Sequence, residues 1–506
     1  MRYLSSCHRP AARKRQGPTL PEGGKMSLAR PQLTILSEDQ RRQIYLSMLE
    51  VLERTGVEVA EEEALQVLRH GGATVQGTRA FIPPHMVKAA LASAPPRFTV
   101  HARDAGKSLR IEPGRVYYGP GPTCPYFVDV STGQRRRYVR HDAATTARVC
   151  DALDNIDFVM SLGAISDVRQ SMCDVYEFAE MAANTVKPIV AWSFTLESCE
   201  EIHRMAIAIA GGEEEFSRRP NFIFYAEPLS PLASNKEAAQ KLVYCSRHRI
   251  PLVYTPCPIA GATAPATLAG VLVNALAESI HGLVISQLLQ PGTPFVAGGV
   301  VSIMDMAETV LSYGAPELSL LSAALSEMCH FLGLPMWSTA GCTDSKLMDE
   351  QAAVESAVSV AMAGLSGADL VHDVGFIESA MTGSLDMLVV SDEIIAMARR
   401  ILRGFEVDDA TLATEVISEV GPAGQFLDHR HTAERFRREF WFPRLMDRSR
   451  YDSWNAGGRH TLLERARERL SRILAEHHAP QLPARAAEAI GSILAEREKK
   501  EAKAAP

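Results

Sequence analysis

The chain has 506 residues, of which 46% are hydrophobic and 22% are charged, and its formal net charge is −7 at pH 7. These values are typical of a globular protein too long for one minimal core, and the negative charge offers no attraction for nucleic acid. The nine cysteines occur singly, and neither a C-x-x-C pair nor an H-E-x-x-H motif is present. We therefore expect no disulfide framework, no metal site and a reducing cytoplasm.

Residues 1–30 are basic at their start and rich in Pro and Gly, and they lack the apolar core of a signal peptide. We expect a disordered tail there, with Met26 as a candidate start of translation. No apolar run reaches the roughly 18 residues that a spanning helix needs. The sequence therefore predicts no membrane partner.

Residues 31–150 are interpreted as an α+β domain. Apolar residues recur every three or four positions from 37 to 70, with a break at Gly56, which predicts two helices. From about 98 to 139 short alternating segments surround a turn at 131–133. This texture predicts a small antiparallel meander.

Between residues 151 and 400 short apolar runs alternate with helical patterns. Strands buried on both faces read as nearly continuous apolar runs, so eight such runs predict an α/β fold of the (β/α)8 TIM-barrel type. The runs are 158–166, 188–194, 221–227, 251–257, 294–299, 335–341, 369–375 and 387–393. A doubly wound open sheet is the alternative. Residues 401–506 are helical and charged, and we expect a C-terminal helical extension.

In such a barrel, functional groups gather where the strands end. The predicted strand ends carry Trp192, Phe194, Tyr225, Tyr254 and Trp337. Each ring could simply pack in the core. Together, aromatic faces at one mouth would attract a quaternary ammonium ion through cation–π contact. We therefore expect these rings to bind substrate.

Polar groups at the same ends supply the candidate catalytic residues, Glu227, Asp344 and His372. Glu227 could instead be a loop carboxylate, and His372 could be a structural histidine rather than an acid–base or ligand-positioning group. Asp349 is the better helix cap, which leaves Asp344 for the mouth.

Two further positions are assigned to substrate binding. Asp373 follows His372 directly, so one of the two side chains must face the barrel interior or its mouth. Gly341 would let the backbone approach a ligand closely.

Other motifs in the sequence give little indication of function. The G-P-G-P run at 119–122 lacks the GK[ST] ending of a phosphate loop, and two of its four residues have no N–H. The H-x-H at 429–431 is interpreted as structural rather than metal-binding. A G-x-S-x-G nucleophile elbow is absent from the sequence.

Four separated motifs resemble the trimethylamine methyltransferase family, in the order that the family has them. They are YYGPGPTCPYFVDVSTGQRRR, GCTDSKLMDEQAAVES, MLVVSDEIIAMARR and EVGPAGQFLDHRHTAERFRREFWFPRLMDR. The resemblance covers about residues 31 to 480. It implies a (β/α)8 barrel that passes a methyl group from a methylated amine to the Co(I) centre of a corrinoid (cobalamin). The corrinoid would be supplied by a separate corrinoid-binding protein, with no cofactor bound tightly by this chain. We also expect a homo-oligomer.

One departure from the family pattern narrows the expected substrate. Founding members carry pyrrolysine in the barrel and use trimethylamine. This chain contains only the twenty ordinary amino acids, and the position equivalent to pyrrolysine is expected near Gly341 and Cys342. Members without pyrrolysine resemble demethylases of quaternary amines such as glycine betaine, so a quaternary amine is the expected substrate. Two rival hypotheses are a binding or scaffold protein that has lost turnover, and a barrel lyase or hydrolase that uses Glu227 or His372 as base.

Overall fold

The computed structural model describes residues 27–504 and resolves two compact units. The main unit comprises residues 32–402 and 442–504, and the minor unit comprises 27–31 and 403–441. The expected boundary at residue 150 therefore does not separate the units, and the C-terminal extension is divided between them. Of the expected N-terminal tail, residues 1–26 lie outside the described residues.

The main unit is built on a seven-stranded sheet in which every neighbouring pair is parallel. Its order is β10 (Ile189–Ala191), β11 (Phe222–Ala226), β13 (Leu252–Tyr254), β15 (Phe295–Gly298), β18 (Met336–Thr339), β19 (Leu370–His372) and β7 (Tyr117–Tyr118). Six of the eight predicted runs are among these strands, and they follow one another in chain order. A doubly wound sheet reverses its strand order, so that alternative is wrong.

The predicted strand at 387–393 is also wrong, because these residues lie inside helix α12 (Leu385–Arg403). Every residue from Met387 to Ile395 is buried, and a helix buried all round gives the same continuous apolar run as a buried strand. The position beside β19 is taken instead by β7, from the segment assigned to the N-terminal domain.

The remaining predicted run, 158–166, forms no regular strand but lies between the two edge strands of the sheet. The Asp157 N–H donates to the Tyr118 carbonyl of β7 at 2.7 Å, and Val159 pairs with Ile189 of β10 in a parallel bridge. One short segment thus contacts both edges.

A hydrophobic cluster occupies the space that the strands enclose. It takes at least one side chain from each of the seven strands, together with Phe158 and Met160 of the bridging segment. One end is filled by the hairpin of β5 (Phe98–Val100) and β6 (Leu109–Ile111), which contributes Val100, Leu109 and Ile111. The interior is therefore a packed core, and the hairpin covers one end of it.

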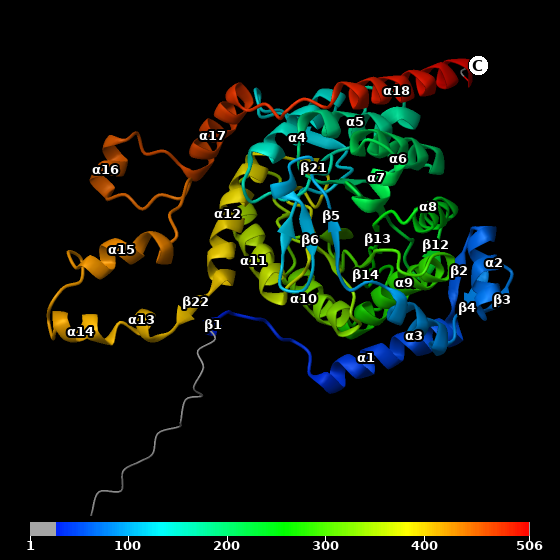
Figure 1. Cartoon of the computed structure of the whole chain (residues 1–506), viewed down its shortest axis with the longest axis horizontal. Coiled ribbons are helices and arrows are strands. Elements are labelled where there is room, and N and C mark those ends of the chain that lie inside the picture. Colours follow the sequence, from blue (N-terminus) through cyan, green and yellow to red (C-terminus); the bar gives the residue numbers. More distant parts are fainter. Residues whose placement is uncertain (1–26, 505–506) are drawn as a thin grey trace, which may run out of the picture. The chain divides into compact units, whose positions relative to one another are not determined.

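Helices surround these strands (Figure 1). Along the chain they are α4 (Arg140–Ala152), α5 (Cys173–Asn184), α6 (Leu196–Ala210), α7 (Glu213–Arg218), α8 (Lys236–Arg247), α9 (Leu268–Leu289), α10 (Pro316–Phe331), α11 (Glu350–Ser366) and α12. Asp349 caps α11 by accepting from the Ala352 N–H at 3.0 Å, which confirms its predicted role. Helix α9 is long and apolar enough to cross a membrane, but 72% of the relevant window is buried, as in the core helix of a soluble protein.

Short strands after the main ones form small additional sheets. They are β14 (Ile259–Ala260), β16 (Ser302–Asp305) and β17 (Val310–Ser312) in one sheet, and β8 (Tyr126–Val128), β9 (Arg135–Arg137), β20 (Phe376–Ile377) and β21 (Thr382–Gly383) in another. The predicted single meander at 98–139 is therefore wrong. Its hairpins β5–β6 and β8–β9 are antiparallel but belong to different sheets, and β7 joins the parallel sheet.

The first residues of the main unit contain the two predicted helices, α1 (Glu38–Glu50) and α2 (Glu62–Gly71), on either side of Gly56. A four-stranded sheet of β2 (Val57–Val59), β3 (Thr74–Gln76), β4 (Arg79–Phe81) and β12 (Ala233–Ser234) and helix α3 (Pro84–Ser93) complete this region. At the other end of the chain, α16 (Tyr451–Ala456), α17 (Leu462–Glu476) and α18 (Ala484–Ala504) belong to the same unit.

The minor unit contains α13 (Asp409–Leu412), α14 (Thr414–Val420), α15 (Arg430–Glu439) and an antiparallel pair of β1 (Ser27–Ala29) with β22 (Phe405–Val407). Residues 27–29 of the expected tail are thus a strand. In α15, His429 caps the helix by accepting from the His431 N–H at 3.0 Å. Among residues 27–504 no cluster of His, Cys, Asp and Glu suits a metal ion.

Candidate functional site

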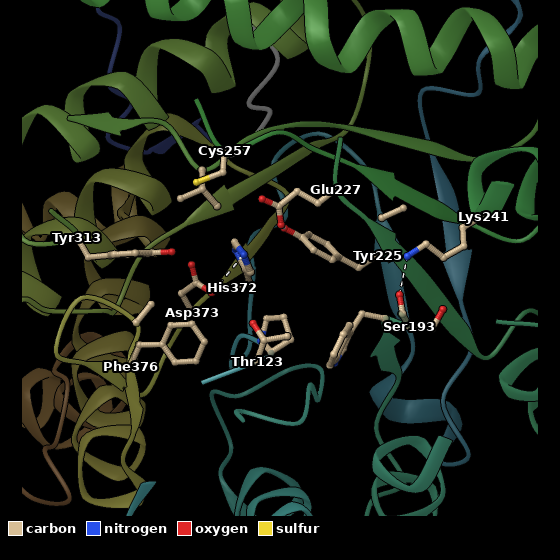
Figure 2. Close-up of a pocket in the computed structure, with 15 residues that line it drawn as sticks. Thr123, Ser193, Tyr225, Glu227, Lys241, Cys257, Tyr313, His372, Asp373 and Phe376 are labelled. Atoms are coloured by element: carbon tan, nitrogen blue, oxygen red, sulfur yellow. Dashed lines mark hydrogen bonds and ion pairs between the residues drawn. The ribbon is translucent and has the colours of Figure 1, made fainter. Parts of the chain in front are cut away.

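A cavity of about 290 Å³ opens where the strands of the main sheet end (Figure 2). Six of the seven strands contribute to its wall through their last residues or the segments that follow. The lining comprises Pro122, Thr123, Trp192, Ser193, Tyr225, Ala226, Glu227, Lys241, Cys257, Val300, Tyr313, His372, Asp373, Phe376 and Ala380. Parallel strands end at the same edge, which is why segments far apart in sequence meet here.

Glu227, directly after β11, supplies an acidic group to the cavity. Its Oε2 accepts from the Tyr225 hydroxyl at 3.1 Å. Much of its side chain is open to the cavity, yet protein surrounds it, and this desolvation raises the pKa of Glu227 to about 6. The carboxyl is therefore mostly ionised at neutral pH and can balance the charge of a cation.

Lys241, on α8, is the cationic side chain of the lining. Its ammonium donates to the Ser193 carbonyl at 2.5 Å, and burial lowers its pKa. In Figure 2 it lies at the opposite side of the cavity from Tyr313 and Phe376. The two ends of the cavity thus differ in charge.

His372 ends β19 and Asp373 follows it, and each side chain of this buried pair is only 2% exposed. The histidine Nδ1 lies 2.9 Å from the Ser338 carbonyl, and its Nε2 lies 3.2 Å from Asp373 Oδ1. Burial lowers the pKa of His372 to about 4. Burial and the charge of Glu227 raise the pKa of Asp373 well above its usual value.

Aromatic rings form much of the remaining wall. Trp192 follows β10, and its indole N–H donates to Glu177 Oε2 at 3.0 Å. Tyr313 follows β17, Phe376 begins β20, and both are buried. Burial raises the pKa of the Tyr225 and Tyr313 hydroxyls and of the Cys257 thiol. These groups are therefore uncharged at neutral pH, and the thiol is a weak nucleophile.

The segment after β7 passes very close to this site. A Cβ on Gly121 would lie 2.1 Å from Asp373 Oδ1 and 2.5 Å from the Phe376 ring, so only glycine fits. Three lining residues that are not glycine have left-handed backbones, Thr123 (φ 70°), Asp373 (φ 74°) and Ala380 (φ 66°). Such conformations cost about 1 to 3 kcal/mol each and cluster at functional sites.

Five of the ten predicted site residues line this cavity: Trp192, Tyr225, Glu227, His372 and Asp373. The other five lie elsewhere in the main unit. Trp337 is fully buried beneath the cavity, with its ring 4.7 Å from that of His372 and 5.6 Å from that of Tyr225. Phe194 packs edge-on against Trp192 at 4.7 Å, outside the lining.

Tyr254, Gly341 and Asp344 also lie outside the lining. The Tyr254 ring packs on helix α9 beside Gly282, because its position on β13 points away from the enclosed core. Gly341 has a φ of +79°, and its Cα faces Val374 rather than the cavity. Cys342 is fully buried.

Asp344 forms hydrogen bonds to two segments that line the cavity. Its carboxylate accepts from the Tyr313 N–H at 2.8 Å, from the Ser379 hydroxyl at 2.7 Å and from the Ser312 hydroxyl. Tyr313 and Ala380, next to Ser379, both line the cavity. The geometry favours a positioning role for this aspartate over direct contact with a ligand.

Sequence reasoning missed several lining residues. The G-P-G-P run at 119–122 resembles no phosphate loop and so does not mark Thr123, but the position of Thr123 shortly after the Tyr117–Tyr118 strand is a usable signal. Tyr313 and Phe376 follow short strands that lie beyond the main strand ends. Lys241 lies inside a helical pattern, and only the tertiary fold shows that it faces the cavity.

Comparison with known proteins gives consistent matches along the chain. The family model described as trimethylamine methyltransferase (MTTB) matches residues 7–502. A trimethylamine methyltransferase MttB of Desulfitobacterium hafniense is 32% identical over 467 residues, which cover 91% of this chain and 93% of the relative. A glycine betaine methyltransferase of the same species is 31% identical over 456 residues, which cover 89% and 94%.

A third relative, the trimethylamine methyltransferase MttB of Methanosarcina barkeri, is 31% identical over 466 residues, which cover 90% of this chain and 93% of the relative. Among solved structures, the monomethylamine methyltransferase MtmB of Methanosarcina barkeri matches with a TM-score of 0.48 and 10% identity. That match covers 86% of this chain and 92% of the solved one.

Proposed function

Because the chain belongs to the trimethylamine methyltransferase family, we propose that it transfers a methyl group from a quaternary amine to the Co(I) centre of a corrinoid carried by a partner protein. The main support for this proposal is the cavity. Its wall combines the Glu227 carboxylate with the rings of Trp192, Tyr225, Tyr313 and Phe376. A fixed cation that cannot donate a hydrogen bond is held best by such a surface.

The chemistry needs little more from the protein. Methyl transfer from a quaternary nitrogen is an in-line displacement in which the nitrogen leaves as a neutral amine. Alignment of the N–CH3 bond with the acceptor and a matched electrostatic surface are the expected contributions. The corrinoid is a second substrate that arrives with its partner, so this chain needs to hold only the amine.

We infer that the fold is a closed barrel in which segment 157–163 serves as the eighth strand. Its hydrogen bonds to β7 and β10 support this, since they join the two edges of the sheet. The enclosed cluster, with members from all seven strands and from this segment, also supports it. Closure would leave the amine cavity open only at the strand ends.

The corrinoid partner would dock at the end of the barrel where the cavity opens. Exposed apolar side chains sit in the segments that follow five of the seven strands, among them Met306 at 76% and Leu347 at 67% exposure. The set is Phe194, Leu229, Met306, Val310, Leu347 and Met381. Apolar groups gathered on one face mark a binding surface, and a partner seated here would bring its cobalt to the cavity.

The test is a methyl-transfer assay with free cob(I)alamin. The protein is incubated with reduced cobalamin and a panel of methylated amines, each paired with its neutral carbon isostere, such as choline with 3,3-dimethyl-1-butanol. We expect the cob(I)alamin spectrum to convert to that of methylcobalamin with a quaternary amine. The neutral isostere should leave the spectrum unchanged.

Two other outcomes would each replace this proposal. Binding of quaternary amines without methylation of cobalamin would support a scaffold that has lost turnover. Product formation without corrinoid would support a barrel lyase or hydrolase with Glu227 or His372 as base. Glu227→Gln, which keeps the shape but removes the charge, is the matched variant and should weaken binding of the cation more than that of the isostere.

A further inference from the structure

The buried Asp373 carboxyl has one basic neighbour among the described residues, His372. The Ser338 carbonyl, 2.9 Å from His372 Nδ1, can only accept, so Nδ1 carries a hydrogen. If the ring is neutral, the lone pair of Nε2 then lies 3.2 Å from Asp373 Oδ1. The neutral ring therefore offers no hydrogen to Asp373, and the donor that the Asp373 carboxyl meets among the described residues is the Thr339 hydroxyl, 3.4 Å from Oδ2.

The surroundings of the pair decide the protonation state of Asp373. Burial disfavours both the imidazolium and the carboxylate, and it lowers the pKa of His372 while raising that of Asp373. The charge of Glu227 also opposes ionisation of Asp373. Other groups that face Asp373 are uncharged, namely the Thr339 hydroxyl at 3.4 Å, the thiols of Cys124, Cys257 and Cys342, and the phenols of Tyr225 and Tyr313. Asp373 is therefore a neutral carboxylic acid that faces the amine cavity.

We propose that Asp373 delivers its carboxyl proton to the amine nitrogen released by methyl transfer, a role that rests on the proposed function. The C–N bond breaks and leaves its electron pair on nitrogen, while the methyl carbon bonds to cobalt. The Asp373 O–H bond then breaks, its proton bonds to that nitrogen lone pair, and the O–H electrons stay on the carboxylate. A quaternary ammonium and a neutral acid become a tertiary ammonium and a carboxylate.

The timing of this step follows from the electrons. The lone pair that takes the proton is the pair of the broken C–N bond, so protonation cannot precede cleavage. A neutral tertiary amine left beside the methylated acceptor could take the methyl group back. Protonation occupies the lone pair of the amine, so the amine is no longer a nucleophile. The new N–H can donate a hydrogen bond to the Asp373 carboxylate, which a quaternary nitrogen cannot do.

The proposal predicts different proton counts for two ligands. Trimethylammonium, the tertiary product analogue, should share a single proton with Asp373, so its binding releases about one proton to solvent. Tetramethylammonium cannot share a proton, so its binding at about pH 7.5 should release almost none. Calorimetric titrations in two buffers of different ionisation enthalpy measure both numbers.

Asp373→Asn is the decisive variant. The amide keeps the size and the neutrality of the side chain, but it has no acid proton. We expect tetramethylammonium to bind within about threefold of the wild-type affinity, since the position is neutral in both proteins. Trimethylammonium should bind without proton release, and turnover with a quaternary amine and cob(I)alamin should fall at least about tenfold.

A matched control is available at the start of the same strand. Asp369 Oδ2 lies 2.9 Å from His330 Nε2, in a second His–Asp pair that does not line the cavity. Asp369→Asn should retain the wild-type proton release with trimethylammonium, whatever its effect on melting temperature.

Some results would overturn the role of Asp373 and leave the proposed function standing. One is a wild-type protein that methylates cob(I)alamin but binds trimethylammonium without proton release. Another is equal release with tetramethylammonium, since the proton would then leave before the reaction. A third is unchanged proton release in Asp373→Asn. Failure of the wild type to methylate cob(I)alamin with any amine would instead reject the proposed function.

Discussion

Trp192 and Glu177 are joined by a hydrogen bond in which the indole N–H donates to the buried carboxyl at 3.0 Å. Glu177 comes from helix α5 and also accepts from the Ile165 N–H at 3.1 Å. The contact fixes one aromatic wall of the cavity from behind. Burial raises the pKa of Glu177 to about 8, so the group is largely protonated at neutral pH.

This raised pKa makes stability depend on pH. Between the ordinary glutamate pKa and about 8, folded Glu177 binds more protons than the unfolded chain, so stability falls as pH rises through that window. Above about pH 6.5 the buried histidines no longer oppose this trend, because their depressed pKa values affect stability only at lower pH. From pH 6.5 to 8 we expect Glu177 alone to cost on the order of 2 kcal/mol.

Glu177→Gln should flatten this loss, as measured by urea unfolding at a series of pH values. Glu278→Gln is a useful comparison, because burial raises the pKa of Glu278 only to about 7 and its effect should end at lower pH. An unchanged slope above pH 6.5 in Glu177→Gln would show that other groups carry the dependence.

Cation binding should depend on the ionisation of Glu227. Its pKa of about 6 means that the carboxylate is lost as pH falls through that value. Tetramethylammonium affinity should therefore drop towards pH 5, approaching about tenfold per unit once the group is mostly protonated. Calorimetry from pH 5 to 7.5 measures this, and Glu227→Gln should bind weakly with little pH dependence over the same range.

The aromatic wall should contribute binding energy beyond packing. Trp192→Ala removes a ring from the cavity, and a desolvated cation–π contact is worth on the order of 2 kcal/mol, or about thirtyfold in affinity. We expect this loss for a quaternary amine, with a similar effect in Tyr225→Ala and with the fold retained. Wild-type affinities in both variants would assign these rings to core packing.

Asp344 provides a test of positioning against direct charge contact. If Asp344 lay at the mouth in direct contact with the substrate, Asp344→Asn would weaken binding of a cation more than binding of a neutral isostere. Its contacts with Ser312, Tyr313 and Ser379 instead lead us to expect similar losses for choline and 3,3-dimethyl-1-butanol. We also expect about 1 kcal/mol of lost stability from the weakened hydrogen bonds. Dissociation constants of the variant for both ligands distinguish the two roles, and a loss confined to choline would favour direct charge contact.

The sequence by itself determined the family and the parallel α/β character. Six apolar runs became neighbouring strands in chain order because strands buried on both faces need apolar residues throughout. Apolar residues at 387–393 led to the wrong prediction of a strand, because a helix buried on all sides gives a similar apolar run. Trp192, Tyr225, Glu227, His372 and Asp373 were predicted to lie together because parallel strands bring their ends to one edge, and they line one cavity.

Only the tertiary structure decided which strand-end residues face the cavity. Successive side chains of a strand point to opposite sides, and burial in the sequence pattern does not reveal which side is the interior. Tyr254 therefore packs on α9 while Tyr225 lines the cavity. Glu177 and Lys241 lie on helices and Tyr313 follows an added strand, so their places near the site depend on long-range packing that no local spacing encodes.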